Sequence, residues 1–145
     1  MLPEGLASIG RYAFARCESL TGVTIPENVT WIDEYAFSHC SSFTEIILPE
    51  GITEIAAGTF AHCRNMLHIV IPESVDTIER FAFYECFHLN IFCHANKNQG
   101  RIWNEGWDIY ESEGALSGRV EYEYLPVYWK GEWQYNSNGI PEPLI

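Results

Sequence analysis

The side chains best suited to chemistry in this 145-residue chain recur at intervals of 23 residues. His39, His62 and Glu85 occupy the same position of this interval, so we expect His39 and His62 to be close neighbours in space. Two imidazoles and a carboxylate form a ligand set that suits transition metals. The same position holds Arg16 one interval earlier and falls on an outer turn, where polar side chains are the default. We therefore expect solvated side chains here and no metal site.

Four of the five cysteines form a second row, one residue further along each interval. His39-Cys40 and His62-Cys63 each set an imidazole beside a thiol, as in a cysteine nucleophile and its base. The two side chains of each pair should alternate between outside and inside, which separates them. The chain also lacks a Gly-x-Ser-x-Gly element, a phosphate-binding loop and a His-Glu-x-x-His motif. We expect reduced thiols packed as small apolar groups, no enzymatic activity and no cofactor. The row consists of Cys17, Cys40, Cys63 and Cys86.

A column of carboxylates has the same spacing and raises the possibility of calcium binding. Stacked carboxylates repel one another, and we expect a solvated edge rather than a cation site. The column consists of Glu4, Glu27, Glu50 and Glu73.

These rows belong to a repeat of 23 residues that keeps its register over four copies. A period of this length with several apolar positions per copy is typical of a solenoid, in which each unit buries its apolar face against its neighbours. The chain should therefore fold as a solenoid. The clearest columns are Pro3/Pro26/Pro49/Pro72, Ile9/Ile32/Ile55/Ile78, Phe14/Phe37/Phe60/Phe83 and Leu20/Phe43/Met66/Leu89.

Each repeat contains signals for a strand, a turn and a short helical turn. Residues 23–25 alternate like a strand, and Pro26-Glu27-Asn28 favours the turn that follows. The spacing of Ala36, Phe37 and Cys40 indicates one helical turn on the outer side. We therefore predict an α/β leucine-rich-repeat solenoid, with parallel strands on one face and short helical turns on the other.

The repeat resembles the BspA-like leucine-rich repeats of bacterial surface proteins. The matching pattern reads Ile-Pro-Glu-Asn-Val-Thr-Trp-Ile at 25–32 and Ala-Phe-Ser-His-Cys at 36–40, and Thr59 departs from the alanine of the other copies. The resemblance covers residues 1–95, about four repeats. It implies a secreted or surface-attached bacterial module for adhesion or protein interaction, with a host or matrix protein as partner.

The repeat columns fail after Leu89, and aromatic residues crowd the segment 96–145. We predict that this segment is an aromatic-rich β cap on the solenoid, with residues 127–129 and 132–135 forming a hairpin. The family resemblance places Cys93 in the last strand, outside the thiol row. The alternative for the aromatic residues is a platform for carbohydrate, made by Trp103, Trp107, Trp129 and Trp133.

The strand face of the solenoid is the strongest candidate for partner binding. Apolar outward positions increase toward the C-terminus, and a contiguous exposed apolar patch usually marks an interface. Two alternatives for these apolar positions remain open: β-branched residues favour strands in any case, or the cap folds over them. A third role for the chain is that of a purely structural spacer. The candidate partner-binding residues are Glu45, Ile47, Leu67, His68, Val70 and Ile91.

Charge and hydropathy argue against several classes of partner and against a membrane span. A net charge of −12 with eight scattered basic residues argues against nucleic acid and against anionic membrane surfaces. No apolar run reaches the ~20 residues of a membrane span, and residues 1–4 lack the features of a signal peptide. The chain opens in the middle of a repeat, so we expect the C-terminal portion of a longer protein, with weak self-association at the uncapped end.

Overall fold

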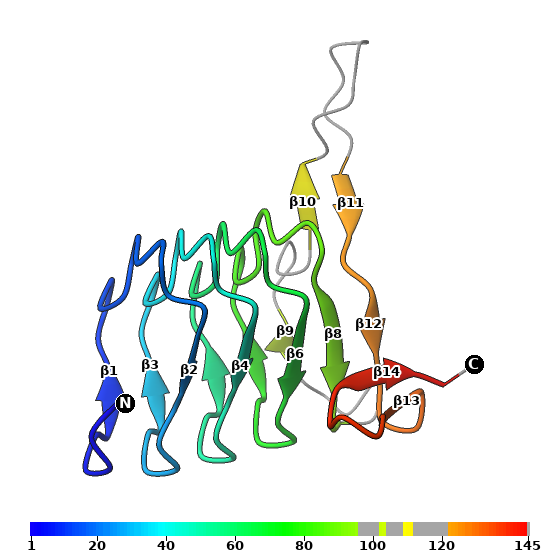
Figure 1. Cartoon of the computed structure of the whole chain (residues 1–145), viewed down its shortest axis with the longest axis horizontal. Helices are drawn as coiled ribbons and strands as arrows, with labels where there is room; N and C mark the ends of the chain where they lie inside the picture. The colour runs from blue at the N-terminus through cyan, green and yellow to red at the C-terminus, as the bar shows by residue number, and fades with distance from the viewer. Residues whose placement is uncertain (96–101, 104–108, 112–121, 145) are drawn as a thin grey trace, which may run out of the picture.

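The computed structural model describes residues 1–95, 102–103, 109–111 and 122–144, and it forms a parallel β-solenoid (Figure 1). Successive coils of the chain lie side by side, and residues 122–144 lie at one end of the row. The sequence prediction of a solenoid with 23-residue spacing is confirmed.

The main sheet carries one strand from each coil and runs along one side of the solenoid. Its strands follow the order β12-β8-β6-β4-β2, and all four pairings are parallel. Equivalent residues of neighbouring coils face each other, as with Glu45 and His68 or Ile46 and Ile69. The strands are β2 (Gly22–Thr24), β4 (Glu45–Ile47), β6 (His68–Ile71), β8 (Asn90–Cys93) and β12 (Val127–Tyr128).

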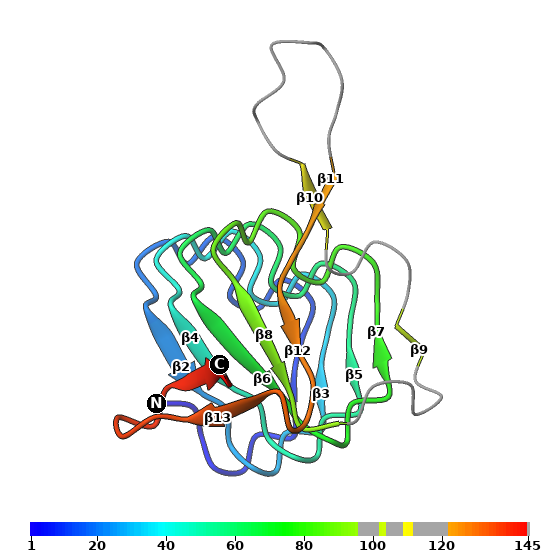
Figure 2. The same cartoon turned by 90° about the vertical axis from the view of Figure 1, so that its right-hand side faces the viewer.

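A second row of short parallel strands runs on the opposite side, as the view along the solenoid shows (Figure 2). It contains the isoleucine column, whose members are buried, and it was not predicted from the sequence. β1 pairs with β3, and β7 pairs with β5 and β9. The strands are β1 (Ser8–Ile9), β3 (Trp31–Ile32), β5 (Glu54–Ile55), β7 (Thr77–Ile78) and β9 (Ile102–Trp103).

The core lies between the two rows of strands and is built from stacked columns. The phenylalanine rings stack nearly parallel, with centroids 5.2 Å apart for Phe14–Phe37, 5.8 Å for Phe37–Phe60 and 5.7 Å for Phe60–Phe83. The last three rings of the column are fully buried, whereas Phe14 at the open end is half-buried. Each coil therefore buries its apolar residues against the next coil, as the repeat pattern predicted.

The predicted helical turns are not confirmed, because the described residues contain no helix. Consecutive tight turns take their place, and backbone hydrogen bonds explain why. The N–H groups of Tyr12, Phe14 and Arg16 donate to carbonyls of the next coil, which leaves only the intervening amides for bonds within the coil. An α-helix needs every successive amide for its own ladder. Tyr12 and Arg16 adopt φ near +60°, and the equivalent residues of later coils repeat this conformation.

The last repeat is one residue shorter than the others. The side chains of its strand therefore face the opposite sides of the sheet from those that the 23-residue spacing predicts. His68 pairs with Asn90, 22 residues later, so Ile91 aligns with Ile69 and faces the core. A shift by one residue turns every strand side chain to the opposite face. The expectation that Ile91 is exposed is therefore wrong, since its exposed fraction is 0%. Cys93 belongs to the last repeat strand, as the family resemblance implied.

The strands of the C-terminal segment pair with different partners from those predicted. β12 extends the main sheet beside β8 instead of forming a hairpin with β13. β13 (Trp133–Tyr135) pairs antiparallel with β14 (Pro141–Pro143), and β10 (Ile109–Glu111) pairs antiparallel with β11 (Tyr122–Tyr124). The predicted pairing of 127–129 with 132–135 is wrong. Within the described ranges, no helix has the length and apolar character of a membrane span.

Candidate functional site

The open face of the main sheet carries the candidate partner-binding residues. Alternation along β4 buries Ile46 and directs Glu45 and Ile47 outward, and β6 repeats this pattern with His68 and Val70. Ile47 is 73% exposed, and Leu67, just before β6, is 52% exposed. Five of the six candidates therefore have the expected outward position, whereas Ile91 lies in the core. Whether these residues bind a partner stays a prediction.

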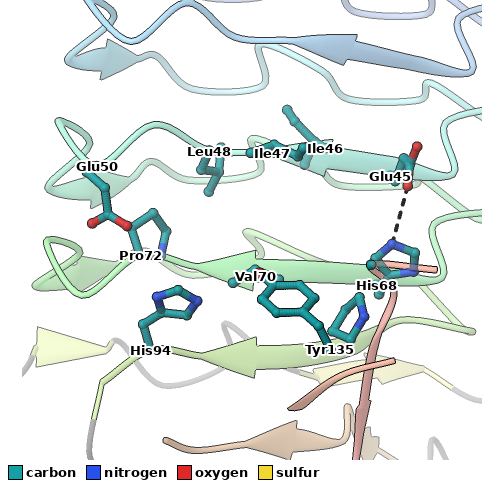
Figure 3. A pocket seen from close by; sticks show the side chains of 12 residues that line it. Glu45, Ile46, Ile47, Leu48, Glu50, His68, Val70, Pro72, His94 and Tyr135 are labelled. Carbon is teal, nitrogen blue, oxygen red and sulfur yellow. Dashed lines mark ion pairs between the residues drawn. The ribbon is translucent and has the colours of Figure 1, made fainter. Parts of the chain in front are cut away.

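The C-terminal hairpin β13–β14 turns part of this flat face into a groove of about 200 Å³ (Figure 3). Its floor consists of residues from β4 and β6, and the hairpin contributes Tyr135, Gly139 and Pro141. Figure 3 shows Tyr135 beside Val70. Sequence reasoning missed these three residues, because no periodic signal connects the hairpin to the repeats. The remaining lining residues are Glu45, Ile46, Ile47, Leu48, Glu50, His68, Val70, Pro72 and His94.

Contacts of Trp133 hold the hairpin beside the last repeat strand. Its indole Nε1 donates a hydrogen bond of 3.0 Å to the carbonyl oxygen of Cys93. Its ring packs against Phe92 and His94, with centroid distances of 5.4 Å and 5.3 Å. Phe92 faces outward in register with Val70 and also stacks on Tyr128 at 5.1 Å, which leaves it only 2% exposed. The ring of Phe92 is thus covered by the C-terminal segment.

The charged groups of the groove lie at its two ends. At one end, Glu45 Oε2 lies 3.4 Å from His68 Nε2, an ion pair when the imidazole is protonated (Figure 3). Glu50 lies at the other end, beside Pro72 and His94, and is exposed. Among the described residues, no lysine or arginine lines the groove. The groove therefore combines an apolar floor with carboxylates at both ends.

The tryptophans proposed as a carbohydrate platform have different surroundings. Trp129 packs partly buried against the core, and Trp133 is half-buried by the contacts described above. Trp103 belongs to β9 in the second row of strands, and Trp107 lies outside the described residues. Trp133 also lines a shallow depression with Glu73, His94, Lys130 and Gly131. The described contacts of Trp129 and Trp133 serve packing, and the carbohydrate role stays a prediction.

The histidine row has the predicted proximity. The rings of His39 and His62 stack with centroids 4.1 Å apart, and His62 Nδ1 lies 2.9 Å from Glu85 Oε2. Burial and the neighbouring charges of His62 and Arg16 lower the pKa of His39. Burial alone would raise the pKa of Glu85, but hydrogen bonds from Arg64 and His62 outweigh it and lower that pKa. Within the described ranges, no group of three or more histidine, cysteine or acidic side chains has a metal-binding arrangement.

The thiol row forms a ladder of hydrogen bonds between coils. The thiols of Cys40, Cys63 and Cys86 donate to carbonyls of the preceding coil at 3.1–3.2 Å. Burial raises the pKa of Cys40 to about 11 and of Cys86 to about 12, and it also raises the pKa of Cys63. Cys17 is exposed. High pKa values keep these buried thiols protonated and unreactive, in contrast to a catalytic cysteine.

Comparisons with known proteins add a family and structural neighbours. A family model described as BspA type leucine-rich repeat region, in six copies, matches residues 1–101. The fold is similar to a leucine-rich cell surface protein from Faecalibacterium prausnitzii A2-165, with 28% identity and a TM-score of 0.62 over 80% of this chain. It is also similar to a leucine-rich repeat protein from Bacteroides ovatus ATCC 8483, with 22% identity and a TM-score of 0.60 over 97% of this chain. The chain spans 32% of the first neighbour and 41% of the second. A comparison with curated proteins finds no match.

Proposed function

Because this chain belongs to the BspA-type leucine-rich repeat family, we propose that it is a non-catalytic module that binds a protein partner through the open face of its main sheet. Solenoids of this kind offer an extended surface to partners. The observation that carries the proposal is the apolar surface of this face, where Ile47 and Leu67 are exposed and Ile47 lies next to the half-buried Val70 in the groove. Apolar side chains that remain exposed and contiguous are typical of an interface.

The size of the groove favours a protein partner over a small molecule. Pockets for drug-sized ligands have volumes of roughly 300–1,000 Å³. The groove has about 200 Å³, enough for one or two side chains of a partner that also rests on the sheet around it. The partner class that we propose is a host or matrix protein, in keeping with a secreted or surface-attached bacterial module. The cell surface protein among the structural neighbours supports that location.

We assign residues 1–95 to the solenoid and residues 96–145 to a cap that protects its C-terminal end. An open solenoid end exposes apolar side chains and unpaired backbone groups, which promote aggregation. The pairing of β12 with β8 and the burial of Leu125 in the core support this division. So does the covering of Phe92 by Tyr128 and Trp133.

Binding of purified matrix and host-cell proteins to the immobilised chain tests the proposed function. Ile47→Asn should weaken binding of a true partner by about tenfold or more, as expected for a central interface residue. Thr24→Asn is the matched control, because Thr24 is exposed at the same sheet position one coil earlier and does not line the groove. A partner that binds wild type and Ile47→Asn equally would place the function elsewhere on the molecule.

A further inference from the structure

The groove presents the chemistry that a long basic side chain requires. Its floor is apolar where Ile47 and Val70 lie next to each other on paired strands. Tyr135, whose exposed fraction is 52%, and Pro141 form the facing wall. Arginine and lysine bury their aliphatic stems against such surfaces and keep the charged group at the edge.

Glu50 is the counter-charge available at the end of this floor. The other carboxylate, Glu45, already lies 3.4 Å from His68. The side chain of Glu50 forms no ion pair within the described part of the chain, and its exposed position keeps the carboxylate accessible. Within the described part of the chain, the lining of the groove contains His68 and His94 but no lysine or arginine, so Glu50 is open to a lysine or arginine from a partner. The net charge of −12 also attracts basic partners over longer distances.

We propose that the groove between β4–β6 and the β13–β14 hairpin accepts an arginine or lysine side chain from an exposed segment of the partner, with Glu50 as its counter-charge. The stem of this side chain lies on Ile47 and Val70, and its cationic group reaches Glu50. This inference rests on the proposed function, because it names the chemistry by which the open face recognises its partner.

An NMR titration of the full chain tests this proposal with defined probes. The probes are an acetylated, amidated Gly-Gly-Arg-Gly-Gly peptide and the same peptide with citrulline, which keeps the shape of arginine without its charge. The methyl signals of Ile47 and Val70 should shift with the arginine peptide. Binding of the citrulline peptide should be about three- to fivefold weaker, the effect expected for a partly exposed ion pair.

Two variants identify the carboxylate. Glu50→Gln should weaken binding of the arginine peptide by the same factor of about three to five. Glu27→Gln is the matched control, because Glu27 is exposed, follows a proline at the same repeat position and does not line the groove. Glu27→Gln should leave the affinity for the arginine peptide unchanged. This control distinguishes a specific ion pair with Glu50 from an effect of the net charge of the protein.

Several results would overturn the proposal. These are equal affinity for the two peptides, equal losses in Glu27→Gln and Glu50→Gln, and no shift of the two methyl signals with either peptide. Failure of this inference can be told apart from failure of the proposed function. A protein partner that is sensitive to Ile47→Asn but not to Glu50→Gln supports the open face and refutes the basic side chain. In the converse result, the peptides bind as expected while Ile47→Asn affects the binding of no protein partner. That result refutes the proposed function alone.

Discussion

Removal of one ring from the phenylalanine column tests the energetic basis of the solenoid. Phe60 is fully buried and stacks between Phe37 at 5.8 Å and Phe83 at 5.7 Å. Replacing a buried phenylalanine by alanine costs about 3–5 kcal/mol, from lost burial and from the cavity that remains. Domains of this size have about 5–15 kcal/mol of stability in total, so Phe60→Ala should remove a large part of it.

Phe14→Ala provides the matched control within the same column. Phe14 is half-buried, and within the described part of the chain it has a single stacked neighbour, Phe37 at 5.2 Å. With roughly half of the contacts, its loss should cost about 1.5–2.5 kcal/mol. The comparison separates the effect of stacking on both sides from the effect of the residue type.

Urea unfolding followed by circular dichroism measures both variants. With a slope of about 2 kcal/mol per molar urea, a loss of about 4 kcal/mol lowers the midpoint by about 2 M. Amide exchange should accelerate at Phe37 and Phe60, whose N–H groups donate to the next coil at 2.9 Å, since coils of a solenoid stabilise their direct neighbours. A loss below about 1 kcal/mol for Phe60→Ala, or equal losses for the two variants, would refute the reasoning.

Three further predictions concern the thiols, the histidines and the C-terminal segment. In native protein a maleimide should label Cys17 alone, and mass spectrometry should find the other four thiols labelled only after unfolding; rapid labelling of Cys63 would contradict the buried ladder. Burial and cationic neighbours lower the pKa of His39, so below pH 6.5 the unfolded chain binds more protons than the folded chain. The free energy of unfolding should therefore fall as pH drops from about 7 through the folded-state pKa of His39. His39→Gln should reduce this fall in urea titrations at several pH values, whereas His88→Gln, at an exposed histidine, serves as the control; an unchanged slope in His39→Gln would contradict it. Deletion of residues 96–145 uncovers Phe92 and the edge of β8 and should give oligomers in light scattering, while Trp129→Ala should only lower stability; a monomeric 1–95 fragment with native circular dichroism would argue against a cap.

The repeat columns allowed the core to be predicted because the residues of a column pack only on those of adjacent coils. An apolar residue that recurs every 23 positions packs on its own equivalent in the next coil, so period alone predicts which side chains meet. Phe37, Phe60 and Phe83 are buried as expected, and so are Cys40 and Cys63.

The outer turns and the last repeat could not be predicted in the same way. The spacing of Ala36, Phe37 and Cys40 fits a helical turn within one coil, but the N–H of Phe37 donates to Thr59 of the next coil. Propensity within a single repeat takes no account of that neighbour. The prediction for Ile91 was wrong because the last repeat loses one residue after Leu89, and such a deletion is invisible once the columns end.

The sequence by itself determined the repeat length, the family resemblance, the buried columns and the outward positions of Glu45, Ile47, His68 and Val70. Only the tertiary structure decided that these outward residues line a groove. The hairpin that closes the groove is held by the ring of Trp133 on Phe92 and by its hydrogen bond to Cys93, 40 residues earlier in the chain. A contact between a repeat and a non-repeating segment has no period, so its partners emerge only when the chain has folded.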